Sequence, residues 1–242
     1  MEVHHHPQLE HKHKPWKEYI LEGLMIFIAV TMGFFAESIR ENISENSKGK
    51  EYIRSFVEDL RSDVTQYDAS IRELTVKDSI LSKLPACLDT IKQKHHTPAY
   101  MTQMIGESSG FTDFIYTDRT IQQLKNSGGL RMIHDKAAAD SIISYDALVR
   151  AELIHQGAME EWQKTATEAH LNMIPIAQLK NIYRNVGPGK QANDIILLSD
   201  EKKEIESYFN KMWMFKQICA GQKVRLTQLR AKAIRIMAFL EK

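Results

Sequence analysis

The sequence predicts an all-α protein in which one N-terminal transmembrane helix continues into long amphipathic helices, with a helical-bundle, coiled-coil-like extramembrane domain. Three observations support this prediction. The 242 residues include only 11 Gly and 6 Pro, so long stretches lack helix breakers. One segment near the N-terminus is apolar on almost every side, and heptad patterns recur in the charged remainder. The only candidate strand is the short run DIILL at residues 194–198.

The apolar segment LEGLMIFIAVTMGFFAESIR occupies residues 21–40. Its uncharged run between Glu22 and Glu37 is short for a membrane span. Over residues 19–39, however, only these two carboxylates are charged, and at ~1.5 Å per residue the helix reaches roughly 31 Å, about the thickness of a bilayer core. Both carboxylates then lie near the headgroups, where charge costs less, and Trp16 and Tyr19 suit an interfacial position.

Two alternatives to a membrane span remain for this segment. A cleaved signal peptide needs small residues before the cleavage point, whereas a bulky Phe34 precedes Ala36 by two places. A buried helix of a soluble protein must account for a surface without a polar face between residues 24 and 36. We therefore expect an uncleaved transmembrane helix over residues 16–40, after a disordered His-rich tail at residues 1–15.

One face of the expected span combines small residues with charged ends. At about 100° per residue, the small and charged residues of this face fall on one side of the helix. Among them, Ala29 and Gly33 have the small-xxx-small spacing that lets helices approach closely in lipid. We expect this face to pack against other copies of the chain; the alternative is a monomeric anchor in which the face has no role. The predicted helix-packing stripe consists of Glu22, Ile26, Ala29, Gly33, Ala36, Glu37 and Arg40.

Residues 41–242 predict one α-helical extramembrane domain. No strong breaker except Gly49 separates the span from an amphipathic helix at 51–84, so one helix is expected to run from Trp16 to Leu84. Its heptad seam is broken only at Asp78. A last helix from Ser199 carries a second heptad seam with a polar gap at Gln222, and it can lie antiparallel to the first.

Shorter helices are expected between these two seams. The first begins at Pro85, and the second runs over about 99–105. The third runs to about residue 126 and is capped at Thr117–Arg119. The runs GESSG (106–110), NSGG (126–129) and residues 185–194 predict loops. A long helix is expected over 135–173, with one stripe that consists of Leu148, His155, Met159, Trp162, Ala166 and Met173.

The sequence contains no pattern that predicts an enzyme. Glu152-x-x-His155 occurs once, whereas di-metal bundles need a second copy. Nucleotide-binding and hydrolase motifs are absent. We therefore expect no catalytic, cofactor-binding or metal-ligating residues and no cofactor. The histidines of the tail are expected to form a solvated arm, with transition-metal binding as the alternative; these are His4, His5, His6, His11 and His13.

The charge of the chain limits the partners that we expect, and its two cysteines limit the possible disulfides. A net charge of +1 gives no reason to expect nucleic-acid binding. The basic run at 223–235 is expected to be neutralised by acids on a neighbouring helix, and Glu58–Asp59 to lie on a solvated helix face. Cys87 and Cys219 allow either one disulfide or two buried free thiols.

Two segments carry a resemblance to a known family. The first is residues 21–64, where an acidic residue enters the span, a Gly lies in its distal half and an acidic residue leaves it. The second is residues 120–146, a helix, a Ser-Gly stop and another helix. Both are similar to an uncharacterised family of single-pass inner-membrane proteins of Bacteroidota, a domain of unknown function. The resemblance implies a cytoplasmic N-terminus and a helical periplasmic domain; it implies no catalytic residues.

These observations predict a non-enzymatic, membrane-anchored structural or assembly protein. We expect a homo-oligomeric scaffold or an accessory subunit of a bacterial envelope complex, in contact with the lipid bilayer and other envelope proteins. One alternative is an oligomeric channel or transport subunit, with a pore lined by the transmembrane helix at Glu22, Gly33 and Glu37. Another is a membrane-anchored sensor, which would require an apolar pocket with convergent polar groups.

Overall fold

The computed structural model describes residues 15–94, 96–184 and 195–242, and over these residues the chain forms helices joined by short extended connections, without strands. The all-α prediction is therefore confirmed. The expected His-rich tail lies outside the described residues except for Pro15, as does the expected loop at 185–194. The short run considered as the only candidate strand, at 194–198, forms no strand over its described part: residues 195–198 run as irregular chain beside helix α6 (Ile176–Arg184).

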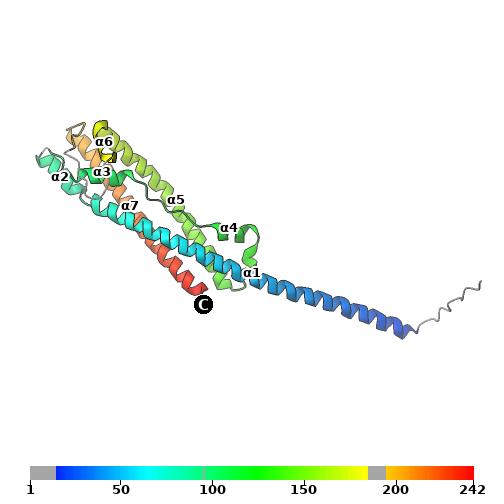
Figure 1. The fold of residues 1–242 in the computed structure, drawn as a ribbon. Coiled ribbons are helices and arrows are strands. Elements are labelled where there is room, and N and C mark those ends of the chain that lie inside the picture. The colour runs from blue at the N-terminus through cyan, green and yellow to red at the C-terminus, as the bar shows by residue number, and fades with distance from the viewer. Residues whose placement is uncertain (1–14, 95, 185–194) are drawn as a thin grey trace, which may run out of the picture.

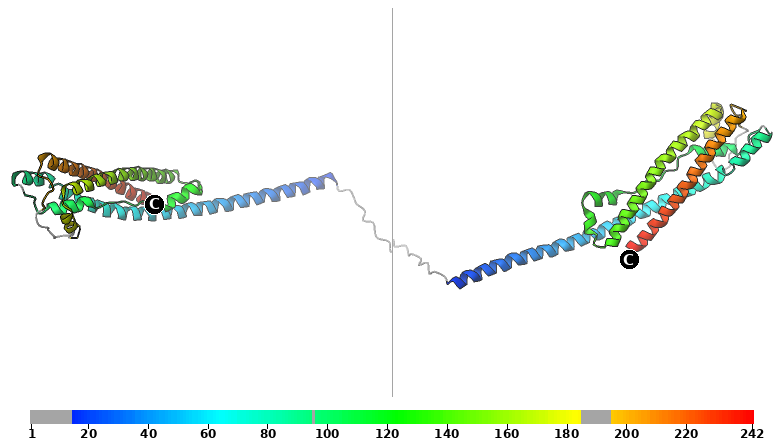
Figure 2. Two further views of the ribbon diagram at one scale, coloured as in Figure 1. Left: turned by 90° about the horizontal axis from the view of Figure 1, so that it is seen from above. Right: turned by 180° about the vertical axis from the view of Figure 1, so that it is seen from behind.

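Helix α1 runs without interruption from Trp16 to Leu81 and is the longest element of the molecule. It ends one turn before the predicted Leu84, at the C-cap Ser82, because α2 (Leu84–Lys94) begins directly after a two-residue turn. The N-terminal part of α1, before the first buried residue Gly49, projects from the remaining helices as a single rod (Figures 1 and 2). The remainder packs in the helical bundle.

Three long helices build the bundle: α1, α5 (Lys136–Met173) and α7 (Lys202–Leu240). Helix α7 lies between the other two in the contact pattern, and it runs antiparallel to α1, as predicted. Ion pairs show this direction, because the residue number of the partner near or on α7 decreases as the residue number on α1 and α2 increases. The pairs are Arg61–Glu241, Asp68–Arg230, Asp78–Lys223 and Lys92–Glu206, the last from α2.

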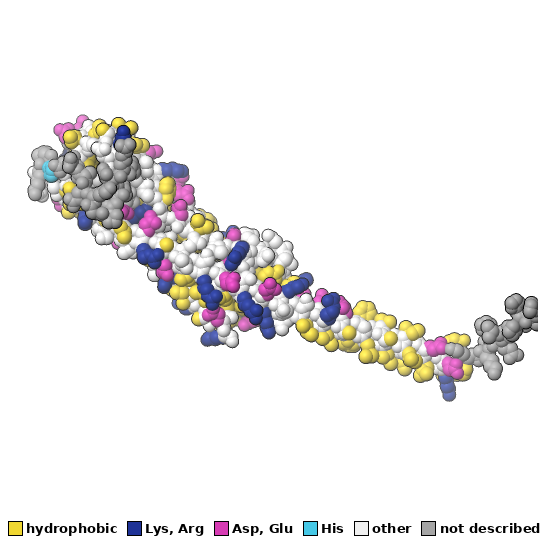
Figure 3. Space-filling model, viewed as in Figure 1, with side chains coloured by type: hydrophobic (Ala, Val, Ile, Leu, Met, Phe, Trp, Pro, Cys, Tyr) yellow, Lys and Arg dark blue, Asp and Glu magenta, His cyan; other side chains and the backbone are white. Residues whose placement is uncertain are grey.

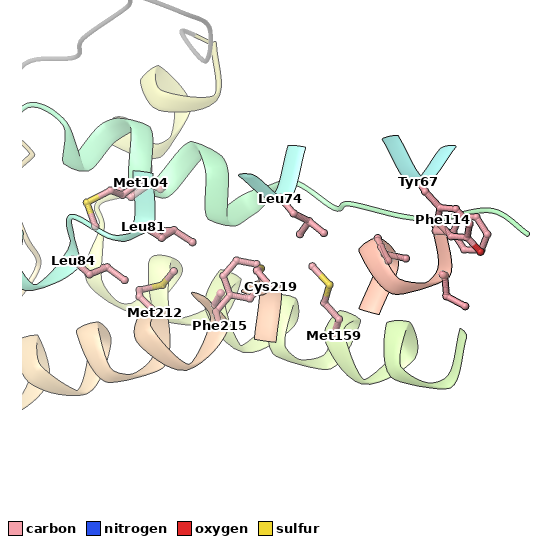
Figure 4. Close-up of a cluster of buried hydrophobic side chains, with 14 of the residues drawn as sticks. Tyr67, Leu74, Leu81, Leu84, Met104, Phe114, Met159, Met212, Phe215 and Cys219 are labelled. Atoms are coloured by element: carbon pink, nitrogen blue, oxygen red, sulfur yellow. The ribbon is translucent and has the colours of Figure 1, made fainter. Parts of the chain in front are cut away.

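The core of the bundle follows the two predicted heptad seams. Tyr67, Leu74 and Leu81 of α1 are fully buried and point toward α7 and α5 (Figure 4). From α7, Phe215 and Cys219 meet them. Side chains at successive a and d positions interdigitate in this way when two helices share a heptad repeat. Helix α7 begins at Lys202, three residues after the predicted Ser199.

Helix α5 buries only part of the predicted stripe, in which Trp162 is half-buried against the core. Leu148 is 46% exposed and His155 is also exposed. In the first part of the helix, the buried apolar residues are instead Ala138, Ile142, Tyr145 and Val149. Besides apolar residues, this helix buries polar side chains such as Asp146 and Glu152, which have partners on other elements. Met159, Ala166 and Met173 are buried as predicted.

Short helices close the two ends of the bundle. The stop at residues 126–129 is confirmed, since α4 (Arg119–Asn126) is followed by Gly128 in the left-handed region and by the short helix η1 (Gly129–Met132). The predicted loop at 106–110 is wrong, because α3 (Met101–Ser109) includes most of it. Within α3, the hydroxyl groups of Ser108 and Ser109 donate hydrogen bonds to backbone carbonyls of the preceding turn. These bonds let the two polar residues continue the helix.

Candidate functional site

The predicted helix-packing stripe lies entirely on the projecting part of α1. All seven of its residues are exposed, and a methyl group added at Gly33 would meet no atom within 4 Å. Within the stripe, Glu37 pairs with Arg40, with a distance of 2.9 Å between Arg40 Nε and Glu37 Oε2. The stripe is thus a continuous surface that the bundle does not use.

Apolar side chains surround the whole projecting segment. From Trp16 to Ile43, every large apolar side chain is between 47% and 74% exposed. Figure 3 shows these side chains gathered along the projecting rod, whereas charged side chains cover the bundle. By length and composition, α1 is the one helix among the described residues that could cross a membrane. An apolar surface of this extent is unusual for a protein surrounded by water.

A glycine forms the junction between this rod and the bundle. Gly49 is the first buried residue of α1, and it packs against the backbone of η1. A β-carbon at Gly49 would lie 2.1 Å from the carbonyl oxygen of Met132. The close approach therefore requires glycine at this position, and it brings η1 near the end of the projecting segment. Arg131 of η1 also reaches Glu45 at 3.8 Å.

Two buried aspartates of α1 hold the start of α4. Asp59 accepts hydrogen bonds from Arg119 Nε and from the backbone N–H of Thr120, and Asp63 accepts one from the backbone N–H of Thr117. The predicted local cap is therefore wrong in mechanism: Asp118 occupies the N-cap position but makes no side-chain cap. Carboxylates from another helix instead satisfy amides at the helix start.

The burial of Asp59 also corrects the sequence prediction for Glu58–Asp59. The Asp59 side chain is 1% exposed, whereas that of Glu58 is 64% exposed. Neighbouring residues on a helix point about 100° apart, so one of two adjacent acids can face the core while the other faces water. The signal that could have identified Asp59 is its position beside the heptad residue Leu60.

Two tyrosines extend this polar cluster into the core. Tyr145 donates a hydrogen bond of 2.7 Å to Asp63 Oδ2, and its hydroxyl lies 3.0 Å from that of Tyr67. Burial raises the pKa of Asp63 to about 6, although the hydrogen bonds from Tyr145 and Thr117 oppose this shift. Burial also raises the pKa of both tyrosines, so both hydroxyls remain protonated donors.

A third buried aspartate secures the other side of α4. Asp146 of α5 accepts hydrogen bonds from Lys125, Arg150 and the hydroxyl of Tyr116. Burial alone would raise the pKa of Asp146, but hydrogen bonds from the two cations outweigh burial and lower it. Together with Asp59 and Asp63, it binds the segment 116–125 to both α1 and α5.

The extended connection between α3 and α4 is held by side chains of the long helices. The side-chain amide of Gln156 forms hydrogen bonds with both the N–H and the carbonyl of Phe114. The side-chain oxygen of Gln66 accepts a hydrogen bond from the N–H of Ile115. The fully buried Lys77 donates to the carbonyl of Gly110. These contacts satisfy backbone groups of a segment that has no neighbouring strand. They show why α1 and α5 bury polar residues that a purely apolar pattern misses.

The basic run at 223–235 is neutralised as predicted at three positions. Lys223 lies 3.2 Å from Asp78, Arg225 lies 2.7 Å from Glu152, and Arg230 Nε lies 2.6 Å from Asp68 Oδ1. Asp78, the break in the first seam, also pairs with Lys216. Glu152 of the Glu-x-x-His pattern therefore has an arginine partner.

A buried Ser–His–Tyr cluster joins α3, α5 and α7. Ser108 Oγ lies 2.8 Å from His170 Nε2, and His170 Nδ1 lies 3.0 Å from the hydroxyl of Tyr208. A serine beside a histidine resembles a nucleophile with its base. Here, however, Ser108 and His170 are at most 1% exposed, and burial lowers the pKa of His170 to about 4. Without access for a substrate, the cluster serves packing.

The two cysteines are free and buried, which selects the second of the two sequence alternatives. Burial raises the pKa of the Cys87 thiol to about 12 and that of Cys219 to about 11. Both thiols are therefore protonated and shielded at neutral pH. Among the described residues, no cluster of three or more His, Cys, Asp and Glu side chains could hold a metal ion.

One sizeable cleft lies at the end of the bundle distant from the projecting rod. Its volume is about 790 Å³, within the range of small-molecule sites. Its lining includes the apolar side chains of Ile91, Ile195 and Ile205 and the basic residues Lys92 and Lys202. The sensor hypothesis would place its ligand here.

Comparisons with protein-family models, curated proteins and solved structures found no match to the chain. The architecture and the local chemistry are thus the observations from which a function is inferred.

Proposed function

We propose that residues 19–39 of α1 anchor this protein in a bacterial inner membrane, and that it acts as a non-enzymatic, self-associating scaffold or accessory subunit of an envelope complex. The observation that carries the proposal is the continuous apolar surface of α1 between Trp16 and Ile43. Burial of this surface in lipid would be favourable by roughly 25 cal/mol for each Å² of apolar area removed from water. The segment's length of roughly 31 Å suits a hydrocarbon core.

Self-association is supported by the stripe within this surface. Its Ala29, Gly33 and Ala36 allow close helix contact, and in lipid such contact is driven by packing rather than by the hydrophobic effect. The bundle leaves the stripe uncovered. The decisive experiment is the molar mass of the full chain in detergent, measured by light scattering with the detergent contribution subtracted. We expect an integral multiple of 27.9 kDa greater than one; a monodisperse monomer would contradict self-association.

The orientation completes the proposal. Following the family resemblance, we place the N-terminus in the cytoplasm and the bundle in the periplasm. A membrane-impermeant maleimide tests this placement on intact cells and on inverted vesicles, with Ala151→Cys as the reporter because residue 151 is exposed on α5. Labelling is expected when reagent is added from the periplasmic side; labelling only from the cytoplasmic side would reverse the orientation.

The pore alternative makes a different use of the same residues. It would place Glu22, Gly33 and Glu37 toward a water-filled lumen. The pairing of Glu37 with Arg40 on one helix favours packing over a lumen role, because the carboxylate already has a cationic partner. Conductance in liposomes that disappears in Glu22→Ala with Glu37→Ala would support the pore; leak equal to that of empty liposomes would exclude it.

A further inference from the structure

The outer face of α1 in the bundle continues the stripe of the projecting segment. At 3.6 residues per turn, a displacement of 36 residues corresponds to about ten full turns and returns to the same side of the helix. Glu22, Ala29 and Gly33 therefore align with Glu58, Thr65 and Ala69. All three of the latter are exposed, although the helix packs in the bundle there. Because α1 is uninterrupted, one line of residues runs from the projecting segment along the bundle.

The bundle packs on the opposite side of α1. Gly49 lies about seven and a half turns after Glu22, and Tyr67 about twelve and a half turns after it, so both face away from the stripe. Gly49 contacts η1, and Tyr67 is fully buried in the core. The cores of α5 and α7 are consequently on the side of α1 remote from the stripe. Two exposed ion pairs, Arg119–Glu58 and Arg61–Glu241, flank the extension of the stripe without burying it.

The charges of this outer face complement a second copy of the same face. Arg54 lies about one turn from Glu51 and one turn from Glu58, and all three side chains are exposed. Two chains anchored in one membrane are parallel, and a two-fold axis along the membrane normal brings the same face of each together. Each Arg54 then lies between carboxylates of the partner. Small Thr65 and Ala69 farther along allow the helices to remain close.

We propose that the surface formed by Glu51, Arg54, Glu58, Thr65 and Ala69 of α1 docks against the same surface of a second copy, with the two bundles pointing away from each other. This inference rests on the proposed self-association and specifies its geometry. Both α1 helices lie at the centre of the assembly, and α5 lies on the periphery. The competing surface is the exposed face of α5, which includes Ala147, Ala151 and Ile154 and has few charges.

Cysteine cross-linking of the full chain in membranes distinguishes these surfaces. Single substitutions Ala29→Cys, Thr65→Cys and Ala151→Cys place a thiol on the stripe, the docking surface and the α5 face, all at exposed positions with small or medium side chains. A short bismaleimide is the probe. The native Cys87 and Cys219 are buried, so the unsubstituted chain provides the background.

The expected result is a covalent dimer from Ala29→Cys and from Thr65→Cys, each several-fold above Ala151→Cys. Charge reversal at Arg54→Glu should reduce the Thr65→Cys yield, and Glu51→Arg with Glu58→Arg in the same chain should restore it. Dimers from Ala29→Cys, with Thr65→Cys no higher than Ala151→Cys, would overturn this docking geometry and leave self-association intact. No dimer from Ala29→Cys, with a monomer in detergent, would overturn the proposed self-association itself.

Discussion

The two parts of α1 use the same backbone in opposite ways. Between Trp16 and Ile43 its apolar side chains are exposed on all sides, whereas beyond Gly49 they are buried along one seam and charged residues cover the rest. No break in the helix separates the parts. The difference shows that helix formation is common to both, while the distribution of apolar residues around the axis decides whether the helix packs against protein or is left for another environment.

The largest effect should come from charge placed in the middle of the projecting part. Phe27→Arg combined with Val30→Arg is expected to cost about 5–7 kcal/mol in membrane insertion, because each arginine at the bilayer centre costs about 2.5–3.5 kcal/mol. We expect the variant to leave the membrane fraction on carbonate extraction. The control is Ile154→Arg with Val224→Arg, at exposed apolar positions of the bundle. Equal extraction of both variants would contradict the membrane assignment.

A smaller but specific effect is expected at the junction of the two parts. Gly49→Ala should lower the free energy of unfolding by about 3 kcal/mol, at the upper end for overpacking, because the added carbon would lie 2.1 Å from the backbone oxygen of Met132. Thermal or denaturant unfolding in detergent measures the change. The matched control is Gly157→Ala on α5, which has open space and should be neutral or stabilising by about 0.5–1 kcal/mol. Equal effects would exclude a close junction.

The neighbours Glu58 and Asp59 allow an exposed and a buried acid of the same helix to be compared within the bundle. Asp59→Ala should cost about 2 kcal/mol, since the buried N–H of Thr120 would lose its acceptor. Glu58→Ala should change stability by less than about 0.5 kcal/mol, because its ion pair is exposed and long. Both values come from unfolding at constant pH. An equal loss in the two variants would mean that Asp59 does not hold α4.

The smallest expected effect is a pH dependence confined to the bundle. The folded-state pKa of Asp63 is raised from 3.8 to about 6, so its contribution to stability is complete below pH 3.8 and is lost as pH rises through 6. Relative to Asp63→Asn, the unsubstituted chain should lose about 1 kcal/mol between pH 5 and pH 7. His170 acts in the opposite direction: its pKa is lowered from 6.5 to about 4, so stability falls as pH falls through this range.

Unfolding of Asp63→Asn and of His170→Phe at several pH values separates these two contributions. A difference between the unsubstituted chain and Asp63→Asn that is constant from pH 5 to pH 7 would contradict the raised pKa of Asp63.

Sequence patterns predicted the parts of the fold in which apolar spacing decides the packing. The seams around Tyr67 and Phe215 follow from heptad periodicity, and the uninterrupted α1 follows from the lack of strong helix breakers. The buried face of α5 was not predictable in this way, because partners far away in the sequence satisfy Asp146 and Glu152. For the same reason, the role of Asp59 at the start of α4 depends on a contact that only the tertiary structure brings together.

The candidate interaction surface shows a similar division. The stripe from Glu22 to Arg40 could be read from residue spacing alone, since it lies on one helix. Its relation to the bundle required the structure, because the side of α1 that packs is set by contacts such as that of Gly49 with Met132.

The unbroken course of α1 also has a mechanical consequence. From Ile39 to Leu81 the helix extends roughly 63 Å beyond the apolar segment, and a transmembrane helix tilts by about 20° on average. A tilt of that size about the membrane surface would displace the far end of the bundle by roughly 20 Å. In the proposed membrane-anchored state, an uninterrupted helix of this length would convert a small change of tilt into a large change of position at the distal cleft.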